Sequence, residues 1–276
     1  MSDSRRGCDW QDLTSRELAE RVAADSVAES VAVLPLAAIE QHGAHLPLST
    51  DLDIGQGLLA AARERLPDGF PLLVLPALAV GASDEHTAFP GTLSLPPEIA
   101  IAVIEAHGDA LARAGVRRLV LFNSHGGNKA VMDLAALKLR RRWGMLVVKA
   151  HYTRFAPTAE GLPAEELRHG LHGGALETAL MLHLAPHKVR REALTHPPSR
   201  GEAMAGRDEL LGPEGEAAFA WMAEDLHPGG VVGNARLADA ALGERLVNHY
   251  AERLARLLGE TRALDIDDFQ ARRDPG

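Results

Sequence analysis

Four short segments of the sequence combine histidines with carboxylates or paired glycines. The first holds Glu40, His42 and Asp51 and directly follows a run of Val and Leu residues. Glu40 and His42 are two residues apart, so in an extended segment their side chains would share a face. Glu, His and Asp are suitable ligands for zinc, manganese or a related divalent ion. A polar loop with a capping Asp is the alternative interpretation, and this segment alone does not decide between them.

A second candidate segment, Asn123–Asn128, follows another apolar run. Gly126 and Gly127 would let the backbone turn sharply and approach a ligand closely. His125 would then be presented at the end of a predicted strand, where sites form in doubly wound sheets. The alternatives are a tight turn with an incidental histidine and a phosphate cradle, but the segment has neither the P-loop pattern nor GxGxxG.

Two more segments bring glycines next to ionisable side chains. In His172–Thr178, Glu177 stands in the first turn of a predicted helix, where the helix dipole also favours an acid for purely structural reasons. In Gly81–His86, Ser83 and His86 are in a position to line the same site. Each of these signals is weak when it is taken alone.

The composition narrows the kinds of site that the chain can form. Its 276 residues contain 29 Lys and Arg against 38 Asp and Glu, a formal net charge of −9. An acidic chain is a poor default for nucleic-acid binding, which requires a basic patch. A single cysteine excludes a disulfide framework and any zinc site with several cysteines. A metal would therefore have to bind histidines, of which there are 13, and carboxylates.

The sequence also predicts a cytoplasmic protein with no membrane partner. Residues 1–12 are polar and lack the apolar core of a signal peptide. The longest apolar stretch, Phe70–Ala82, contains two prolines and is shorter than the ~20 residues that cross a bilayer.

Alternating strand and helix patterns must position the four segments. Short runs rich in Val and Leu predict strands within Ser26–Ala38, Phe70–Val80, Arg117–Asn123 and Met145–His151. Helical spacing predicts helices over Asp53–Leu66, Leu95–Ala114, Asn128–Trp143, Glu177–Leu184 and Asp239–Leu258.

This alternation predicts an α/β fold with a mostly parallel sheet that helices cover on both faces. We expect a single domain over residues 1–276, with an N-terminal arm at 1–25 and a loop-rich insertion at about 194–215.

Taken together, the four segments resemble the motifs of the creatininase (creatinine amidohydrolase) family. Glu40–Pro47 followed by Asp51 is similar to its first metal motif, EQHG-x-HLP and then a Thr-Asp step. Ser124–Asn128 resembles the NGHGGN motif, with Ser124 in place of the usual Gly. Gly81–Thr92 resembles the segment GxSxEHxxFPGT, and His172–Thr178 resembles HxGxxET. The order and spacing of these motifs agree with the family from about Val31 to His187.

The resemblance implies a creatininase-like layered α/β fold and a pair of divalent metal ions, zinc or manganese or both, with a bridging water. By matched position, Glu40 and His42 would bind one metal each, Asp51 would bridge, and His125 would complete one ion's coordination. Creatininase takes a further Glu from the position of Gly127. We infer that Glu177 replaces that missing ligand.

The resemblance also assigns the residues that would act on the substrate. His172 matches the family's proton-shuttling histidine and would protonate the leaving nitrogen. Ser83, Gly126 and Arg168 are the predicted substrate-binding residues. Creatininase has Trp and Asp at the positions of Arg168 and His169, and Tyr at that of Gly126, so the aromatic box for creatinine is absent. Arg168 would instead suit a carboxylate or another anion.

These observations predict a metal-dependent amidohydrolase that uses metal-activated water to hydrolyse a C–N bond of a small cyclic amide or amide-like substrate other than creatinine. One alternative is a short-peptide or formamide hydrolase of cofactor biosynthesis. Another is a catalytically silent binding or regulatory homologue. The resemblance implies a small-molecule substrate and a homo-oligomer, for which the hexamer is the family's frequent form.

Overall fold

Five parallel strands form the main sheet, in the order β1-β3-β2-β4-β5. The computed structural model describes residues 7–24, 26–156, 161–205, 207 and 210–269. The strands are β1 (Cys8–Asp9), β2 (Val31–Leu36), β3 (Leu72–Val74), β4 (Arg118–Asn123) and β5 (Leu146–His151), and two short strands, β6 (Leu211–Gly212) and β7 (Ala217–Ala218), pair separately. The predicted α/β fold with a mostly parallel sheet is confirmed.

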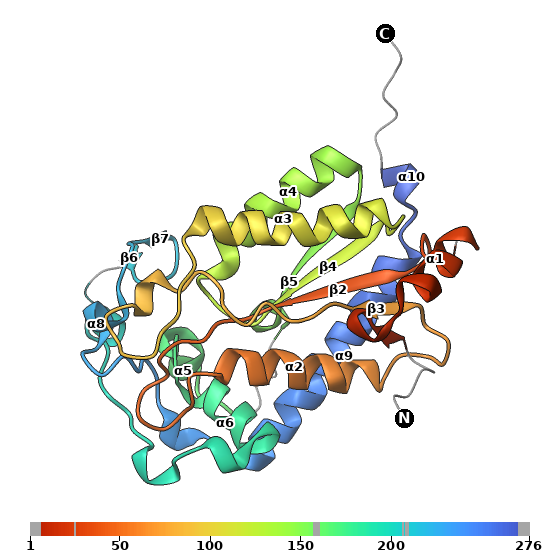
Figure 1. The fold of residues 1–276 in the computed structure, drawn as a ribbon. Helices are drawn as coiled ribbons and strands as arrows, with labels where there is room; N and C mark the ends of the chain where they lie inside the picture. The colour runs from red at the N-terminus through yellow and green to blue at the C-terminus, as the bar shows by residue number, and fades with distance from the viewer. Residues whose placement is uncertain (1–6, 25, 157–160, 206, 208–209, 270–276) are drawn as a thin grey trace.

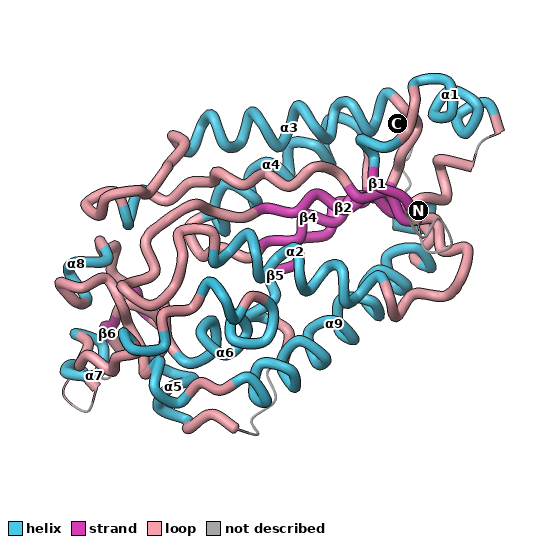
Figure 2. The backbone as a smooth tube through the Cα atoms, turned by 60° about the horizontal axis from the view of Figure 1, so that its bottom comes forward, coloured by secondary structure: helices cyan, strands magenta, loops and turns pink. Residues whose placement is uncertain are grey.

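Helices cover both faces of this sheet, as Figures 1 and 2 show. One layer contains α3 (Pro97–Arg113) and α4 (Asn128–Trp143); the other contains α2 (Thr50–Arg63), α6 (Ala175–Leu184) and α9 (Ala240–Ala263). The remaining helices are α1 (Ser15–Ala23), α5 (Ala164–His169), α7 (Arg200–Met204), α8 (Ala223–Leu226) and α10 (Ile266–Phe269).

The burial of the central strand β2 on both faces explains why its sequence is continuously apolar. All six of its residues are buried. Val33 packs into the hydrophobic cluster of α2, α6 and α9, whereas Leu34, pointing the other way, packs into that of α3 and α4. A parallel strand covered on both faces needs apolar side chains at both alternating positions.

The order of the strands determines where a site can form. From β2 the chain passes through α2 to β3 on one side, and later returns through α3 to β4 on the other side of β2. The carboxyl ends of β2 and β4 therefore meet where the winding reverses, the place at which open α/β sheets bind ligands. The loops at this end gather beside α5, α8, β6 and β7 (Figure 1).

Some predicted elements differ from those observed. The segment predicted as an N-terminal arm contains β1, which extends the sheet beside β3, and α1. The strand predicted over Phe70–Val80 is only three residues long, because Pro71 and Pro76 bracket it and cannot donate ladder hydrogen bonds. The insertion predicted at about 194–215 contains α7 and β6 in its described part.

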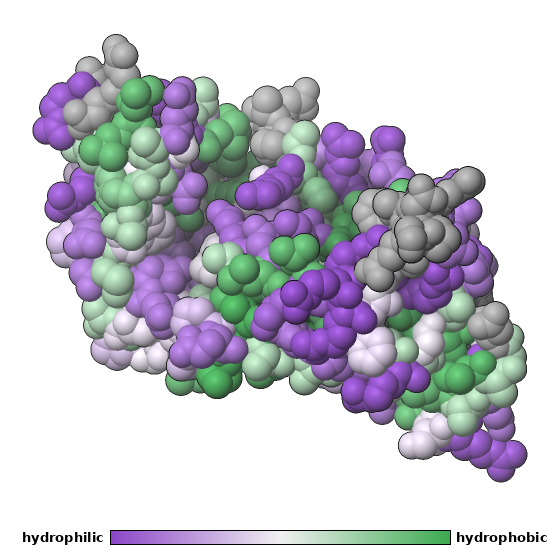
Figure 3. Space-filling model, turned by 90° about the horizontal axis from the view of Figure 1, so that it is seen from above, coloured by the Kyte–Doolittle hydropathy of each residue, from purple (hydrophilic) through white to green (hydrophobic). Residues whose placement is uncertain are grey.

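The surface over α3 and α4 mixes hydrophilic and hydrophobic residues (Figure 3). Leu134, Leu137 and Trp143 of α4 are exposed. The homo-oligomer stays a prediction.

Within the described ranges, no helix is both long enough and apolar enough to cross a membrane.

Candidate active site

The loop after β2 and the first turn of α2 bring three predicted ligands together. Glu40, His42 and Asp51 are buried to within 1% of full burial. His42 Nε2 lies 3.7 Å from Asp51 Oδ1 and 4.0 Å from Glu40 Oε1. Thr50 begins α2, so Asp51 stands in its first turn, where the helix dipole favours an acid.

The end of β4 adds His125 to this group. Its Nδ1 lies 3.2 Å from Glu40 Oε2 and 3.4 Å from Asp51 Oδ2. Parallel pairing places Asn123 opposite Leu36, so the strand ends that carry His125 and Glu40 are level. The two segments thus meet at the carboxyl edge of the sheet, as their positions after strands predict.

The first turn of α6 and the residues just before it add two more side chains to this cluster. Glu177 Oε2 lies 3.9 Å from His42 Nε2, and His172 Nδ1 lies 3.8 Å from Glu40 Oε1. The rings of His42 and His172 are stacked at a tilt, with centroids 4.2 Å apart. The structure therefore gathers all five predicted metal ligands and the predicted catalytic histidine.

The hydrogen bonds of three histidines determine which ring nitrogen faces the cluster. His42 donates from Nδ1 to the Glu40 carbonyl at 3.1 Å, and His172 donates from Nε2 to the Gln41 carbonyl at 2.6 Å. His125 donates from Nε2 to the Ala82 carbonyl at 2.8 Å. When the ring is neutral, the other nitrogen of each histidine therefore has its lone pair toward the carboxylates, the usual arrangement of metal-binding histidines.

His86 is the exception. The Gln41 amide has a fixed orientation, because its oxygen accepts from Gly43 N–H and its nitrogen donates to the Gly230 carbonyl. The same nitrogen donates to His86 Nδ1 at 2.9 Å. The ring proton of neutral His86 is therefore on Nε2, 3.4 Å from Glu40 Oε1. His86 supports Glu40 and has no lone pair to offer a metal.

The cluster has the features of a cation site. His42 Nε2 and Asp51 Oδ2 are buried and have no hydrogen-bond partner. Among the described residues, the ion pairs of Glu40, Asp51 and Glu177 involve only histidines. Buried charges are costly unless they are paired or bind a metal. Imidazole nitrogens and carboxylate oxygens suit zinc and manganese, so the residues fit a divalent metal.

Candidate ligand atoms form two neighbouring groups. Those of Glu40, Asp51 and His125 lie within 4.8 Å of one another, and so do those of His42, His172 and Glu177. A third group of this kind consists of Glu40, His86 and His172, although the tautomer of His86 argues against it. Asp51 approaches one histidine with each of its oxygens.

Protons occupy this site when no metal is present. Burial lowers the pKa of His42, but Asp51 and Glu177 outweigh burial and raise that pKa to about 9. Burial and the charge of Asp51 raise the pKa of Glu177 to about 7, against the opposing effect of His42. Burial alone would raise the pKa of Asp51, but His42 and His125 hold it below its usual range.

The pKa of His172 is shifted in the opposite direction to that of His42. Burial and the neighbouring rings of His42 and His86 hold the pKa of His172 well below its ordinary value. Because Nε2 is committed to the Gln41 carbonyl, Nδ1 is the atom that can exchange a proton within the cluster.

Ser83, one of the predicted substrate-binding residues, contacts a predicted metal ligand. Its side chain is fully buried, and its hydroxyl donates to Glu40 Oε2 at 2.5 Å. The hydroxyl oxygen also lies 3.2 Å from His125 Nε2. The geometry therefore favours a role in orienting Glu40 over contact with a substrate.

The two glycines after His125 differ in their surroundings. Gly126 is exposed, and a Cβ built there would meet nothing within 4 Å. A Cβ at Gly127 would lie 2.3 Å from the Ala82 carbonyl oxygen and 2.5 Å from Glu85 Oε1. The carboxylate of Glu85 thus occupies the space that a ligand side chain at position 127 would need. Sequence reasoning missed this role of Glu85, although its neighbours Ser83 and His86 drew attention to the segment.

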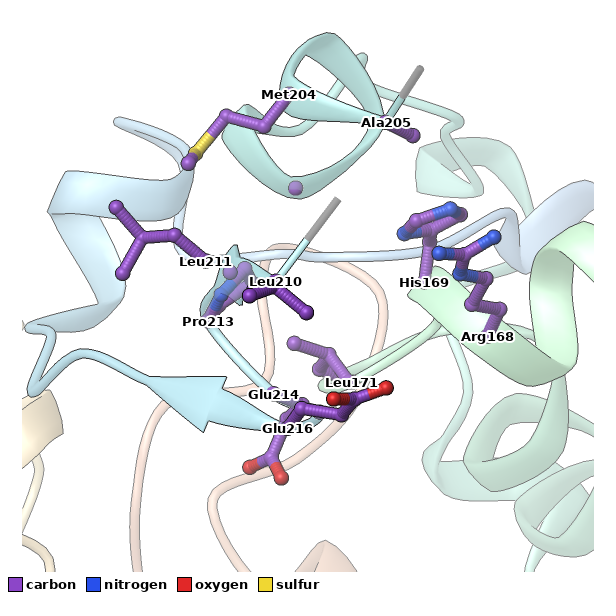
Figure 4. A pocket seen from close by; sticks show the side chains of 13 residues that line it. Arg168, His169, Leu171, Met204, Ala205, Leu210, Leu211, Pro213, Glu214 and Glu216 are labelled. Carbon is purple, nitrogen blue, oxygen red and sulfur yellow. The ribbon is translucent and has the colours of Figure 1, made fainter. Parts of the chain in front are cut away.

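Arg168 does not join the cluster. It is exposed at the end of α5 and lines a separate pocket of about 250 Å³ together with His169 and Leu171. Figure 4 shows Arg168 and His169 on one wall of this pocket and Glu214 on another. The role of Arg168 in substrate binding stays a prediction.

Comparisons with known proteins agree with this geometry. The family model described as creatinine amidohydrolase matches residues 11–258. A mycofactocin precursor peptide peptidase of Mycobacterium tuberculosis is 33% identical over 220 residues, which cover 78% of each chain. A creatinine amidohydrolase of Pseudomonas putida is 31% identical over 210 residues, which cover 68% of this chain and 76% of the relative.

Solved structures are similar over almost the whole chain. A creatinine amidohydrolase (creatininase) structure superposes with a TM-score of 0.74 at 28% identity, covering 95% of this chain and 100% of the other. Similar structures at a TM-score of 0.73 are described as creatininase Mn, at 28% identity, and as a mutant creatininase of Zn-Zn type, at 27%. These cover 93% of this chain and 99% and 98% of theirs. With the family model spanning all the segments that meet at the cluster, the chain belongs to the creatininase family of amidohydrolases.

Proposed function

We propose that this amidohydrolase depends on divalent metal ions and hydrolyses an amide C–N bond of a substrate other than creatinine. The observation that carries the proposal is the pair of buried ligand atoms without a hydrogen-bond partner, His42 Nε2 and Asp51 Oδ2. Within the described ranges, the carboxylates around them form ion pairs with histidines alone. When bound, such ions lower the pKa of coordinated water to about 7 and polarise the amide carbonyl.

The residues of the chain divide this chemistry among them. Glu40, His42, His125 and Glu177 would hold the ions, and Asp51, which approaches His42 with one oxygen and His125 with the other, would bridge two of them. The catalytic role falls to His172, whose Nδ1 would carry a proton to the leaving nitrogen. Its low pKa makes the protonated ring a strong acid, which gives up the proton readily.

Gly126 is exposed and directly follows the buried His125. The space around this residue leaves room for a substrate beside His125. No aromatic side chain of the Trp or Tyr type is present at positions 126, 168 and 169, and this favours a substrate other than a flat cyclic guanidine. A small cyclic amide or an amide-like compound is the first candidate.

A short peptide is the second candidate. It is favoured by the name of the M. tuberculosis relative, a precursor peptide peptidase that is 33% identical over most of this chain. A peptide bond is an amide C–N bond, so the same ligands and the same proton transfer by His172 would serve both substrate classes.

Metal analysis followed by a substrate panel tests the proposal. The purified protein is stripped with a chelator, reloaded with Zn²⁺ or Mn²⁺, and assayed against cyclic amides, formamides, short peptides and creatinine. We expect up to two bound ions per chain and hydrolysis of one non-creatinine class. Absence of stoichiometric metal, or creatinine as the best substrate, would refute it; metal binding without any hydrolysis would favour a silent binding protein.

A further inference from the structure

In the described part of the chain, one buried carboxylate outside the metal cluster has only backbone N–H groups as its hydrogen-bond partners. Glu166 of α5 is 8% exposed. Its Oε1 accepts from Ala175 N–H at 2.7 Å, and its Oε2 accepts from Asn234 N–H at 2.8 Å. The two oxygens thus connect segments that are far apart in the sequence.

Three glycines form the space in which this carboxylate lies. A Cβ built at Gly170 or Gly174 would come within 2.5 Å of Glu166 Oε1, and one at Gly233 would come within 2.9 Å. None of these contacts is tolerable, so all three positions need glycine for Glu166 to sit where it does. The site is built around this carboxylate.

The first segment that Glu166 holds begins α6. Ala175 is the first residue of that helix, and its N-cap, Gly174, has no side chain to accept a hydrogen bond. Glu166 supplies the missing acceptor from a different helix. Two residues further along is Glu177, which binds back to Gly173 N–H at 2.7 Å and faces His42.

The second segment that Glu166 holds lies against His172. Val232 and His172 form an antiparallel bridge, with His172 N–H donating to the Val232 carbonyl and Val232 N–H donating to the His172 carbonyl at 2.7 Å. Asn234 follows two residues later. Glu166 therefore fixes both the helix start that follows His172 and the backbone that pairs with it.

We propose that Glu166 is a positioning residue of the hydrolytic reaction, which sets His172 and Glu177 in place relative to the ligands of the loop after β2. The inference rests on the proposed function. Loss of the clamp frees the turn between His172 and Ala175. Glu177 then binds metal less tightly, and His172 Nδ1 is no longer held near the leaving nitrogen.

The direct test is Glu166→Gln, which keeps the shape but places an NH₂ group against one of two backbone N–H donors. We expect the Zn²⁺ dissociation constant, measured by competition with a chromophoric chelator, to rise about 10- to 100-fold, the usual effect of losing a group that orients a ligand. At saturating Zn²⁺, kcat should stay at least tenfold low while KM changes less than threefold. Glu165→Gln removes the same charge from an exposed neighbour on α5 and should match the wild type.

A second variant reaches the clamp without altering Glu166. Gly174→Ala would push the carboxylate aside and should reproduce the loss of Zn²⁺ affinity and of kcat. Gly259→Ala in α9, where a Cβ meets nothing within 4 Å, is its control. Because both changes break one clamp, the double variant Glu166→Gln, Gly174→Ala should be no worse than the more impaired single variant. If Glu166→Gln does not fold, Gly174→Ala decides alone.

The outcomes separate this inference from the proposed function. Metal binding and hydrolysis by the wild type, with unchanged Zn²⁺ affinity and kcat in both variants, would overturn the positioning role alone. A change confined to the melting temperature would also overturn it, since a merely structural residue behaves in this way. A wild type that binds no metal would instead refute the proposed function.

Discussion

Ser83 donates its hydroxyl hydrogen to Oε2 of Glu40 across 2.5 Å, at full burial. The serine therefore controls the direction of a carboxylate that faces His125 and His172. A Ser83→Ala variant should weaken Zn²⁺ binding about tenfold, since one oxygen of Glu40 loses the group that orients it. Chelator competition and steady-state kinetics check this; an increase in KM with unchanged Zn²⁺ affinity would return Ser83 to a substrate-binding role.

Asp51 should be indispensable, whereas its neighbour Asp53 should not. Asp51→Ala removes the oxygens that approach both His42 and His125, so we expect loss of stoichiometric metal and of hydrolysis. Asp53 lies in the same helical turn but pairs with Lys188 at 2.8 Å. Asp53→Ala should keep both properties. Elemental analysis and a rate assay compare the two, and retained metal in Asp51→Ala would rule out a bridging role.

Removal of the proton-transfer group should separate turnover from metal binding. His172→Ala is expected to lower kcat by about 10²- to 10⁴-fold, the usual contribution of a general acid or base. Since Glu40, His42, Asp51 and His125 remain, metal content should be preserved. A loss of metal equal to that of Asp51→Ala would show instead that Nδ1 of His172 is a ligand.

The metal-free protein should become less stable as the pH rises. His42 has a pKa of about 9 in the folded protein against an ordinary 6.5, so its contribution is complete below about pH 6.5 and is lost as the pH passes 9. The pKa of Glu177 is raised from 4.5 to about 7. Its contribution to the stability of the folded protein is therefore also lost as the pH rises, in this case through pH 7. Urea unfolding of the stripped protein at pH 6, 7.5 and 9 measures the decline.

Zn²⁺ should reverse this pH dependence, because metal ligands must be deprotonated. Binding at pH 7.5 should release protons from His42 and from His125, because the pKa values of both ligands are raised. Calorimetry in buffers of different ionisation enthalpy counts the protons released. A release that does not diminish between pH 8 and 10 would contradict the assignment of the raised pKa to His42.

Gly127 should not accept the ligand side chain that creatininase carries at this position. Gly127→Ala already places a Cβ 2.3 Å from the Ala82 carbonyl oxygen, so we expect about 1–3 kcal/mol of destabilisation. Gly126→Ala, with open space around its Cβ, should change the free energy of unfolding by less than about 0.5 kcal/mol. Equal stabilities of the two variants in urea unfolding would show that both the Ala82 carbonyl and Glu85 move aside at little cost.

Local patterns are sufficient to predict the framework of the site. The apolar runs that form β2 and β4, and the polar segments directly after them, are enough to place Glu40 and His125 at one edge of the sheet. Parallel strands that end level bring their following loops together, and this rule does not depend on long-range detail.

Contacts between distant segments are not predictable in this way. Glu166 lies in a polar stretch whose only local signal is that of an exposed short helix, and its partners Ala175 and Asn234 are 9 and 68 residues away. The two-residue strand β1 has too few residues for an alternation pattern. Matched position assigns Arg168 to the substrate, but the pocket that Arg168 lines with residues 201–216 follows from no local pattern.

The carbonyls that fix the tautomers of His42 and His172 belong to consecutive residues, Glu40 and Gln41. One short stretch of main chain therefore decides on which nitrogen each of two imidazoles keeps its proton. A rotation of these peptide planes would change the direction of both lone pairs at once, so the orientations of His42 and His172 depend on the same stretch of backbone. Substitutions of side chains outside this stretch leave these two carbonyls, and with them the tautomers of both imidazoles, in place.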